Sequence, residues 1–137
     1  MAVTIDQLRA VPLFHGLPDP ALKRVLELGK EVQHEAGAPI LEQDHSGIGF
    51  HLIVAGSASV SIDGAEVARF GPGDYFGEMS VIDGQPRSAS VTAVDEVTTL
   101  AITAWDFEGL MEQHPSMMRA MLSELSSRIR LIERTRA

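Results

Sequence analysis

Short apolar runs separated by turn-forming residues fill the segment from Val32 to Ile102, and this pattern limits the available folds more than any other feature. The residues that separate the runs are Gly37, Pro39, Gly47, Gly56, Gly64, Gly71, Pro72 and Gly73. Within the run at 58–62, apolar and polar residues alternate, which is the two-residue period of a half-buried strand. Many short strands divided by turns predict a β-sandwich or barrel.

The dipeptide Asp63-Gly64 predicts a specific turn within this segment. It lies between the apolar runs at 60–62 and 67–68. Aspartate and glycine both accept the left-handed backbone conformation that a two-residue hairpin turn needs. The two runs are therefore expected to pair as antiparallel strands of one hairpin.

Helical patterns flank the strand-rich segment on both sides. Residues 4–30 contain two stretches with apolar residues at helical spacing, the first preceded by Thr4 and the second begun by Asp19-Pro20, which are typical N-terminal signals. A third stretch begins at Ala104, and His114-Pro115 interrupts it because proline breaks a helix. The expected organisation is a single domain with N-terminal helices at 4–30, a β-roll at 31–103 and C-terminal helices at 104–136.

Composition and charge exclude several classes of protein. The chain has 137 residues, of which 45% are hydrophobic and 22% charged, values that suit one globular domain with a sizeable core. It contains no cysteine, which excludes disulfides, thiolate metal sites and a cysteine nucleophile. Because the net charge is −8 and no long apolar run occurs, we expect no direct binding to nucleic acid, no membrane span and a cytoplasmic location.

Residues 76–91 place one carboxylate and one guanidinium around a glycine turn. Gly77 lacks a side chain, so the backbone there can adopt unusual dihedral angles and approach a ligand closely. Arg87 carries a permanent charge and can bind a phosphate through two parallel hydrogen bonds. Glu78 would repel an anion unless it accepts hydrogen bonds from hydroxyl groups such as those of a ribose. Phosphate and ribose together indicate a nucleotide, whereas an ordinary surface ion pair between the two side chains is the simpler alternative.

The same residues closely resemble the phosphate-binding cassette of cyclic nucleotide-binding domains. This family includes catabolite-activator regulators, cyclic-nucleotide-dependent kinases and cyclic-nucleotide-gated channels. The segments that carry the resemblance are Phe-Gly-Glu-Met-Ser at 76–80, Pro-Arg-Ser-Ala-Ser-Val at 86–91, Val-Pro-Leu-Phe at 11–14, Leu-Pro at 17–18, Gly-Phe-His-Leu-Ile-Val-Ala-Gly at 49–56 and Phe-Gly-Pro-Gly-Asp at 70–74. Together they cover roughly residues 5–130.

The resemblance implies both a fold and a function. The fold is mainly β with flanking helices: a jelly-roll-like β-roll with an N-terminal helical bundle and C-terminal lid helices. The function is that of a receptor or regulatory module for a cyclic nucleotide, cyclic AMP rather than cyclic GMP, with no catalytic residue, no metal site and no further cofactor. An unidentified effector protein is the expected partner. The residues expected to bind the ligand are Gly77, Glu78, Met79, Ser80, Arg87, Ser88 and Ala89.

The final helix carries an apolar stripe with two interpretations. Its members, spaced four, three, four and three residues apart, are Met118, Leu122, Leu125, Ile129 and Ile132. Such a stripe either pairs with a second helix or packs against the chain's own barrel. In the catabolite-activator regulators the corresponding helix pairs across a two-fold axis and closes over the bound base, which implies a homodimer and a hinge near His114. Where those regulators have base-contacting hydroxyls, this chain has Ile132 and Glu133.

Two alternatives from other classes remain open. The sequence Gly-Pro-Gly-Asp at 71–74 is also similar to a turn in cupin-type metalloenzymes, whose metal needs clustered ligands, often a His-x-His pair. The five histidines are instead scattered along the chain, at His15, His34, His45, His51 and His114. The second alternative is an interaction module that has the same fold and no ligand. It would leave a buried arginine without its anion, which carries a desolvation cost.

Overall fold

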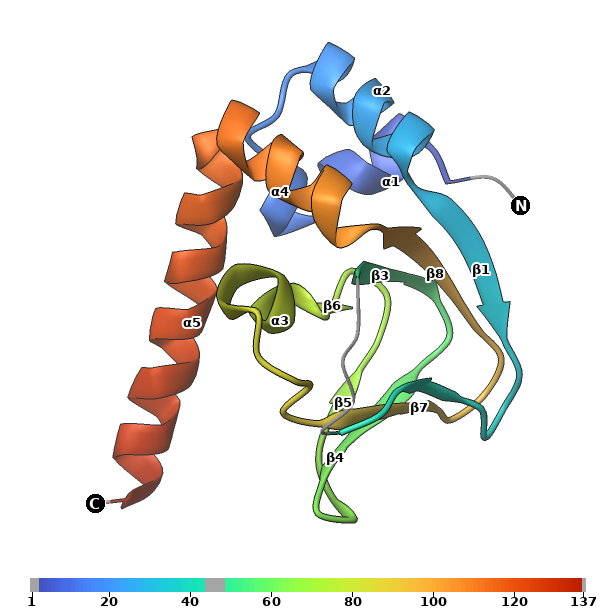
Figure 1. Ribbon diagram of the computed structural model, residues 1–137, viewed down its shortest axis with the longest axis vertical. Helices are drawn as coiled ribbons and strands as arrows, with labels where there is room; N and C mark the ends of the chain where they lie inside the picture. The colour runs from blue at the N-terminus through green and yellow to red at the C-terminus, as the bar shows by residue number, and fades with distance from the viewer. Residues whose placement is uncertain (1–2, 44–48, 137) are drawn as a thin grey trace.

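Two four-stranded antiparallel sheets form the centre of the computed structural model, which describes residues 3–43 and 49–136 (Figure 1). The first sheet has the strand order β1-β8-β3-β6 and the second the order β2-β7-β4-β5. The strands are β1 (Lys30–His34), β2 (Pro39–Leu41), β3 (Phe50–Ala55), β4 (Ala58–Ile62), β5 (Ala65–Phe70), β6 (Tyr75–Phe76), β7 (Ser90–Ala93) and β8 (Val97–Ile102). The turn predicted at Gly47 and the side chain of His45 lie outside the described residues.

The predicted mainly β fold with flanking helices is confirmed, and the sheets form a roll rather than a closed barrel. Within the described residues, the hydrogen-bonded ladders stay inside each sheet and do not join the edge strands of one sheet to those of the other. The hairpin predicted at Asp63-Gly64 joins β4 to β5, and the two residues have φ angles of 52° and 84°. Those left-handed angles are the ones a two-residue hairpin turn requires.

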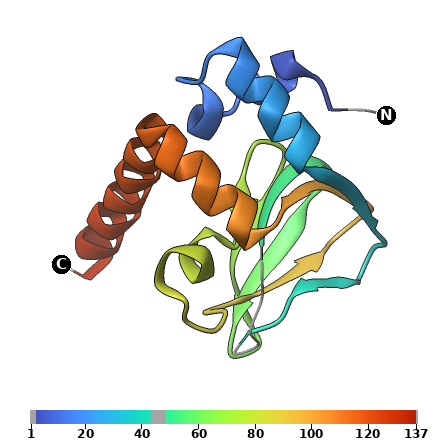
Figure 2. The same ribbon diagram turned by 45° about the horizontal axis from the view of Figure 1, so that its top comes forward.

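Helices cover one end of the roll. The helices of the described residues are α1 (Ile5–Arg9), the 3₁₀ helix η1 (Pro12–Phe14), α2 (Asp19–Leu28), α3 (Glu78–Asp83), α4 (Ala104–Gln113) and α5 (Pro115–Arg136). Figure 2 shows α1, α2 and α4 gathered beside the first sheet. Thr4 begins α1 with a capping box that it shares with Gln7, and Asp19 begins α2, as the sequence predicted. None of the described helices has the length and apolar character needed to cross a membrane.

Two apolar clusters hold the elements in place. The larger cluster lies between the helices and the first sheet, where the ring of Phe50 on β3 stacks on Phe107 of α4 with 4.3 Å between centroids. The Phe14 and Tyr75 rings pack around the same Phe50 ring, at 6.3 and 5.4 Å. The smaller cluster lies between the two sheets and includes Phe76. Phe50 therefore connects the N-terminal helices, the sheet and α4 through direct ring contacts.

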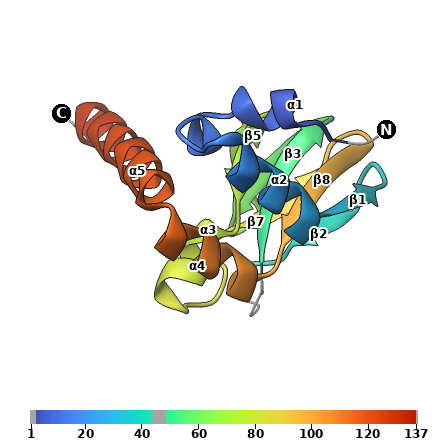
Figure 3. The ribbon, with the colours of Figure 1, turned by 90° about the horizontal axis from the view of Figure 1, so that it is seen from above.

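The last helix extends away from the roll. The predicted break between α4 and α5 occurs at His114, which caps α4. Beyond it, Met117 and Met121 at the start of α5 are buried in the larger cluster. The distal part of α5 projects from the body of the molecule, as Figure 3 shows from above. Leu122 and Ile129 on the predicted stripe are 65% and 56% exposed, so the stripe is not covered by the chain's own roll.

Candidate functional site

A left-handed glycine places the start of α3 beside the first sheet. Gly77 follows β6 directly and caps α3 with a φ of 93°, a conformation that L side chains rarely adopt. A Cβ at this position would collide with the Gly49 carbonyl oxygen and lie 3.0 Å from Nη1 of Arg87. Glycine is thus required for both the conformation and the close packing, and α3 begins directly after it.

Arg87 is buried and held by backbone carbonyls. Its side chain is 4% exposed, Nη1 donates to the Gly77 carbonyl at 3.0 Å, and Nη2 donates to the Gly49 carbonyl at 3.1 Å. The Nε atom has no hydrogen-bond partner among the described residues. Burial lowers the pKa of Arg87 and Glu78 opposes that effect, yet a guanidinium stays protonated in proteins. The site therefore contains a fixed positive charge that is oriented by neutral groups.

Glu78, the first residue of α3, is buried to the same degree. It is 5% exposed, and its Oε2 atom has no partner among the described residues. Burial raises the pKa of Glu78, while a hydrogen bond from its own backbone and the charges of Arg128 and Arg87 lower it. Neither Glu78 nor Arg87 is the exposed partner of a surface ion pair, which was the simpler alternative from the sequence. Both leave polar atoms unsatisfied in one place.

All seven residues predicted to bind a ligand line a single cavity of about 130 Å³. They are Gly77, Glu78, Met79, Ser80, Arg87, Ser88 and Ala89. The remaining lining residues, which sequence reasoning did not identify, are Leu41, Val60, Phe70, Tyr75, Phe76, Val91 and Arg128. Most of these are strand residues, and the period of a strand predicts that one side is buried without revealing which pocket that side faces. The cavity thus combines an apolar wall with a few polar groups, as small-molecule sites do.

Among the described residues of α5, Arg128 is the one that lines this cavity. Its Nη2 atom lies 2.7 Å from Oε1 of Glu124, one helical turn earlier, and its guanidinium carbon lies 6.0 Å from the centre of the Phe70 ring. Glu124 also acts on Tyr75, which lines the same cavity: burial raises the pKa of the Tyr75 hydroxyl, and the Glu124 carboxylate raises it further. The family pattern pointed instead to positions 132 and 133 of this helix. The Glu124–Arg128 spacing of four residues was visible in the sequence, but it is shared by ordinary surface pairs.

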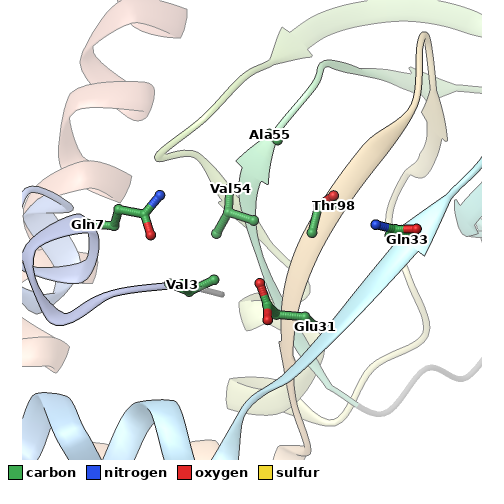
Figure 4. A pocket seen from close by; sticks show the side chains of 7 residues that line it. All are labelled: Val3, Gln7, Glu31, Gln33, Val54, Ala55 and Thr98. Atoms are coloured by element: carbon green, nitrogen blue, oxygen red, sulfur yellow. The ribbon is translucent and has the colours of Figure 1, made fainter. Parts of the chain in front are cut away.

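A larger hollow of about 530 Å³ lies elsewhere, on the outer face of the first sheet (Figure 4). Glu31 and Gln33 from β1 and Thr98 from β8 line one part of it, and Gln7 and Val3 approach from the N-terminal segment. The charged residue among its lining residues is Glu31, an anion. Size therefore does not select the candidate cavity; the smaller one is the candidate because it contains two buried charged groups with unsatisfied atoms.

Comparisons with known proteins agree with this geometry. A family model described as "Cyclic nucleotide-binding domain" matches residues 31–114. The chain is 31% identical over 128 residues to the "Cyclic AMP receptor protein" of Thermus thermophilus, with 90% of this chain and 59% of that protein covered. It is 37% identical over 108 residues to a cyclic nucleotide-gated potassium channel of Rhizobium etli, with 79% of this chain and 30% of the channel covered.

The fold comparison leads to the same group of proteins. The crystal structure of the Thermus thermophilus catabolite activator protein superimposes with a TM-score of 0.80 and 31% identity, over 89% of this chain and 60% of that chain. This chain therefore spans less than two thirds of each of these relatives. The matched part includes the β-roll and all seven predicted ligand-binding residues.

Replacing Gly77 by alanine tests the packing of the site. We expect Gly77→Ala to lower the free energy of unfolding by about 2 kcal/mol more than Gly84→Ala, measured by urea denaturation. Both glycines flank α3 with positive φ angles, of 93° and 69°, but a Cβ at Gly84 meets nothing within 4 Å. Equal losses in the two variants would show that close packing against Gly49 and Arg87 is not required.

Proposed function

Since this chain belongs to the cyclic nucleotide-binding domain family, we propose that it is a receptor or regulatory module for a cyclic nucleotide and has no catalytic activity of its own. The observation that carries the proposal is the pair of buried groups in one cavity, the Arg87 guanidinium and the Glu78 carboxylate, each with an unsatisfied polar atom. A buried charge without a partner is costly, so a ligand that satisfies both groups stabilises the site.

A cyclic phosphate and a ribose suit these two groups. The phosphate supplies the anion that the buried Arg87 guanidinium lacks, through charge-assisted hydrogen bonds. A ribose hydroxyl can donate to Oε2 of Glu78, and this bond favours the ionised carboxylate against the effect of burial. The apolar wall of the cavity, which includes Val60 and Val91, is suited to the carbon skeleton of the sugar.

The identity of the base rests on less specific contacts. Ser88 follows Arg87 and is exposed, so its hydroxyl is free to approach either the phosphate or the edge of a guanine. The Thermus relative carries the name of a cyclic AMP receptor. On this basis we favour cyclic AMP over cyclic GMP as the ligand.

The proposal extends to the last helix. Arg128 and Glu124 connect α5 to the cavity, and His114 separates α5 from α4. Ligand bound against Arg128 would favour the position of α5 closest to the roll, which shifts an equilibrium between two arrangements of the helix. Because Met117 and Met121 anchor the beginning of α5 in the core, movement from a hinge near His114 must repack these two side chains. The effector protein that would respond to this movement of α5 is unidentified.

Truncation of Arg87 tests the ligand and its main contact. Arg87→Ala should weaken binding of cyclic AMP by about 2–5 kcal/mol, because it removes a charge-assisted contact from a buried site. The measurement is isothermal titration of nucleotide-stripped protein with cyclic AMP and with cyclic GMP. Arg69→Ala is the matched control, since Arg69 is an exposed arginine that pairs with Glu66 on the surface.

Two results of this titration would contradict the proposal. An affinity of Arg87→Ala within about threefold of the parent, or roughly 0.7 kcal/mol, would remove Arg87 from the binding site. Failure of the parent protein to bind either nucleotide would favour the ligand-free interaction module of the same fold. Metal analysis of the same preparation tests the cupin-type alternative, which requires a bound metal.

Limited proteolysis tests the response of α5. With cyclic AMP bound, trypsin should cleave after Arg130 and Arg134 more slowly, because a helix held against the roll opens locally less often. Cleavage after Lys23 and Arg24 in α2 is the internal control and should not change. A ligand-dependent position of α5 would be contradicted if nucleotide left the rate of cleavage in α5 unchanged. It would also be contradicted if nucleotide slowed cleavage in α2 and in α5 to the same extent.

Dimer formation through α5 is a further part of the proposal. The exposed stripe continues a groove of about 340 Å³ between α3, α4 and α5, which is lined by apolar residues that include Ile82 and Met118. We expect Leu122→Glu to convert a dimer to a monomer in sedimentation velocity, because it places a charge within the stripe. Leu131→Glu is the control: Leu131 is 59% exposed but lies off the stripe. Identical sedimentation of both variants would rule out this interface.

A further inference from the structure

Two histidines that are far apart in the sequence meet at one buried hydroxyl. Thr99 lies on β8, which is the strand between β1 and β3 in the first sheet. Its Oγ1 atom is 3.2 Å from Nε2 of His34 on β1 and 3.4 Å from Nδ1 of His51 on β3. Thr99 is paired with Val32 and with Ile53, each two residues from a histidine, so the three side chains lie on the same face of the sheet.

The ring of His51 connects this cluster to the ligand cavity. It stacks on Phe76 with 5.2 Å between centroids and 13° between planes, and Phe76 directly precedes Gly77. Among the described residues, the charged or titratable groups that act on His51 are His34 on β1 and Arg87 in the cassette. Burial, followed by these two groups, lowers the pKa of His51 to about 4, and burial also lowers the pKa of His34.

The single proton of the Thr99 hydroxyl limits how the two rings can be protonated. A hydroxyl donates one hydrogen bond, and a neutral imidazole has one donor and one acceptor nitrogen. When Thr99 donates to Nε2 of His34, it accepts from Nδ1–H of His51. When Thr99 donates to Nδ1 of His51, it accepts from Nε2–H of His34. Two neutral arrangements therefore exist, and the tautomers of both rings differ between them.

Acidification removes one of the two arrangements. Because burial, and to a smaller extent Arg87, disfavours a charge on His51, the first proton from solvent goes to His34, which lies on an edge strand. Both nitrogens of His34 then carry protons, so Nε2–H donates to Thr99 and the hydroxyl donates to Nδ1 of His51. The ring proton of His51 is thereby confined to Nε2, and His51 itself gains no proton. One positive charge has been added to the face of the sheet that holds His51.

Building on the nucleotide-binding function proposed above, we propose that His34, Thr99 and His51 form a hydrogen-bonded relay through which acidic pH strengthens the binding of an anionic ligand at Arg87. The added charge on His34 attracts the phosphate. The fixed tautomer of His51 transmits the change to Phe76, the ring that stacks on His51 directly before Gly77. The coupling is reciprocal: a bound anion raises the affinity of His34 for its proton by the same factor.

Nuclear magnetic resonance of the ligand-free protein tests the relay by itself. The ring ¹⁵N shifts of the histidines are followed from about pH 8 to about pH 5, the range in which imidazoles titrate. The relay predicts that the shifts of His51 move to the Nε2–H tautomer as His34 titrates, and that this step disappears in Thr99→Val. His114, at the C-terminal cap of α4, is the reference, and its ring ¹⁵N shifts should be the same in both proteins at every pH.

A second variant is needed because Thr99 is buried and Thr99→Val could fail to fold. His34→Gln changes a half-buried residue on the edge strand and removes the titrating group while it keeps a polar side chain. It should also abolish the acid step of His51. A His51 ring that keeps its tautomer while His34 titrates, or one that changes identically in parent and His34→Gln, overturns the relay.

Measuring cyclic AMP affinity at two pH values distinguishes a failure of the relay from a failure of the proposed function. Cyclic AMP should bind the parent roughly threefold more tightly at about pH 5.5 than at about pH 7.5, the effect of one added charge at some distance in a medium of high dielectric constant. The ratio should be close to one in His34→Gln. Equal ratios in the two proteins overturn the coupling. Absence of cyclic AMP binding at both pH values overturns the nucleotide-binding function, while the ¹⁵N shifts still decide whether the relay exists.

Discussion

The buried guanidinium of Arg87 is the constraint on which the arrangement of the site depends. Its two hydrogen bonds reach the Gly77 carbonyl at the start of α3 and the Gly49 carbonyl just before β3, so one side chain ties the start of α3 to a strand that lies far from it in the sequence. Removing a cation from water costs free energy, and hydrogen bonds to neutral carbonyls offset only part of that cost. The site therefore contains a buried positive charge that neutral groups compensate only in part, and the unsatisfied Oε2 of Glu78 lies in the same cavity.

The two apolar clusters give the charged site a rigid base and leave the last helix less constrained. Phe50 joins η1, the first sheet and α4 by ring contacts, and Phe76 joins the cassette to the space between the sheets. By contrast, α5 is anchored at its beginning by Met117 and reaches the cavity through Arg128 in its distal half. The movement proposed for α5 would therefore take place against a cavity whose other walls are held by the core.

Local signals in the sequence predicted the main elements, and the seven residues that they singled out line one cavity. Asp63-Gly64 specified its turn because few residues accept two left-handed positions, and Glu78 and Arg87 were identified because their chemistry is unusual around a glycine. Arg128 was missed because an arginine four residues from a glutamate is common on exposed helices. The histidines were interpreted as scattered, yet His34 and His51 meet at Thr99, since strand pairing brings together residues that sequence spacing keeps far apart.

The sequence alone thus determined the strand-rich centre, the flanking helices, the break at His114 and the seven residues gathered at the cassette, because each depends on the backbone preferences or the chemistry of neighbouring residues. Only the tertiary structure decided which side chains complete the cavity, that Arg87 is held by carbonyls rather than by a carboxylate, and that two histidines share one hydroxyl. These features depend on the order of strands in the sheets and on the path of α5, which are set by the packing of elements far apart in the chain.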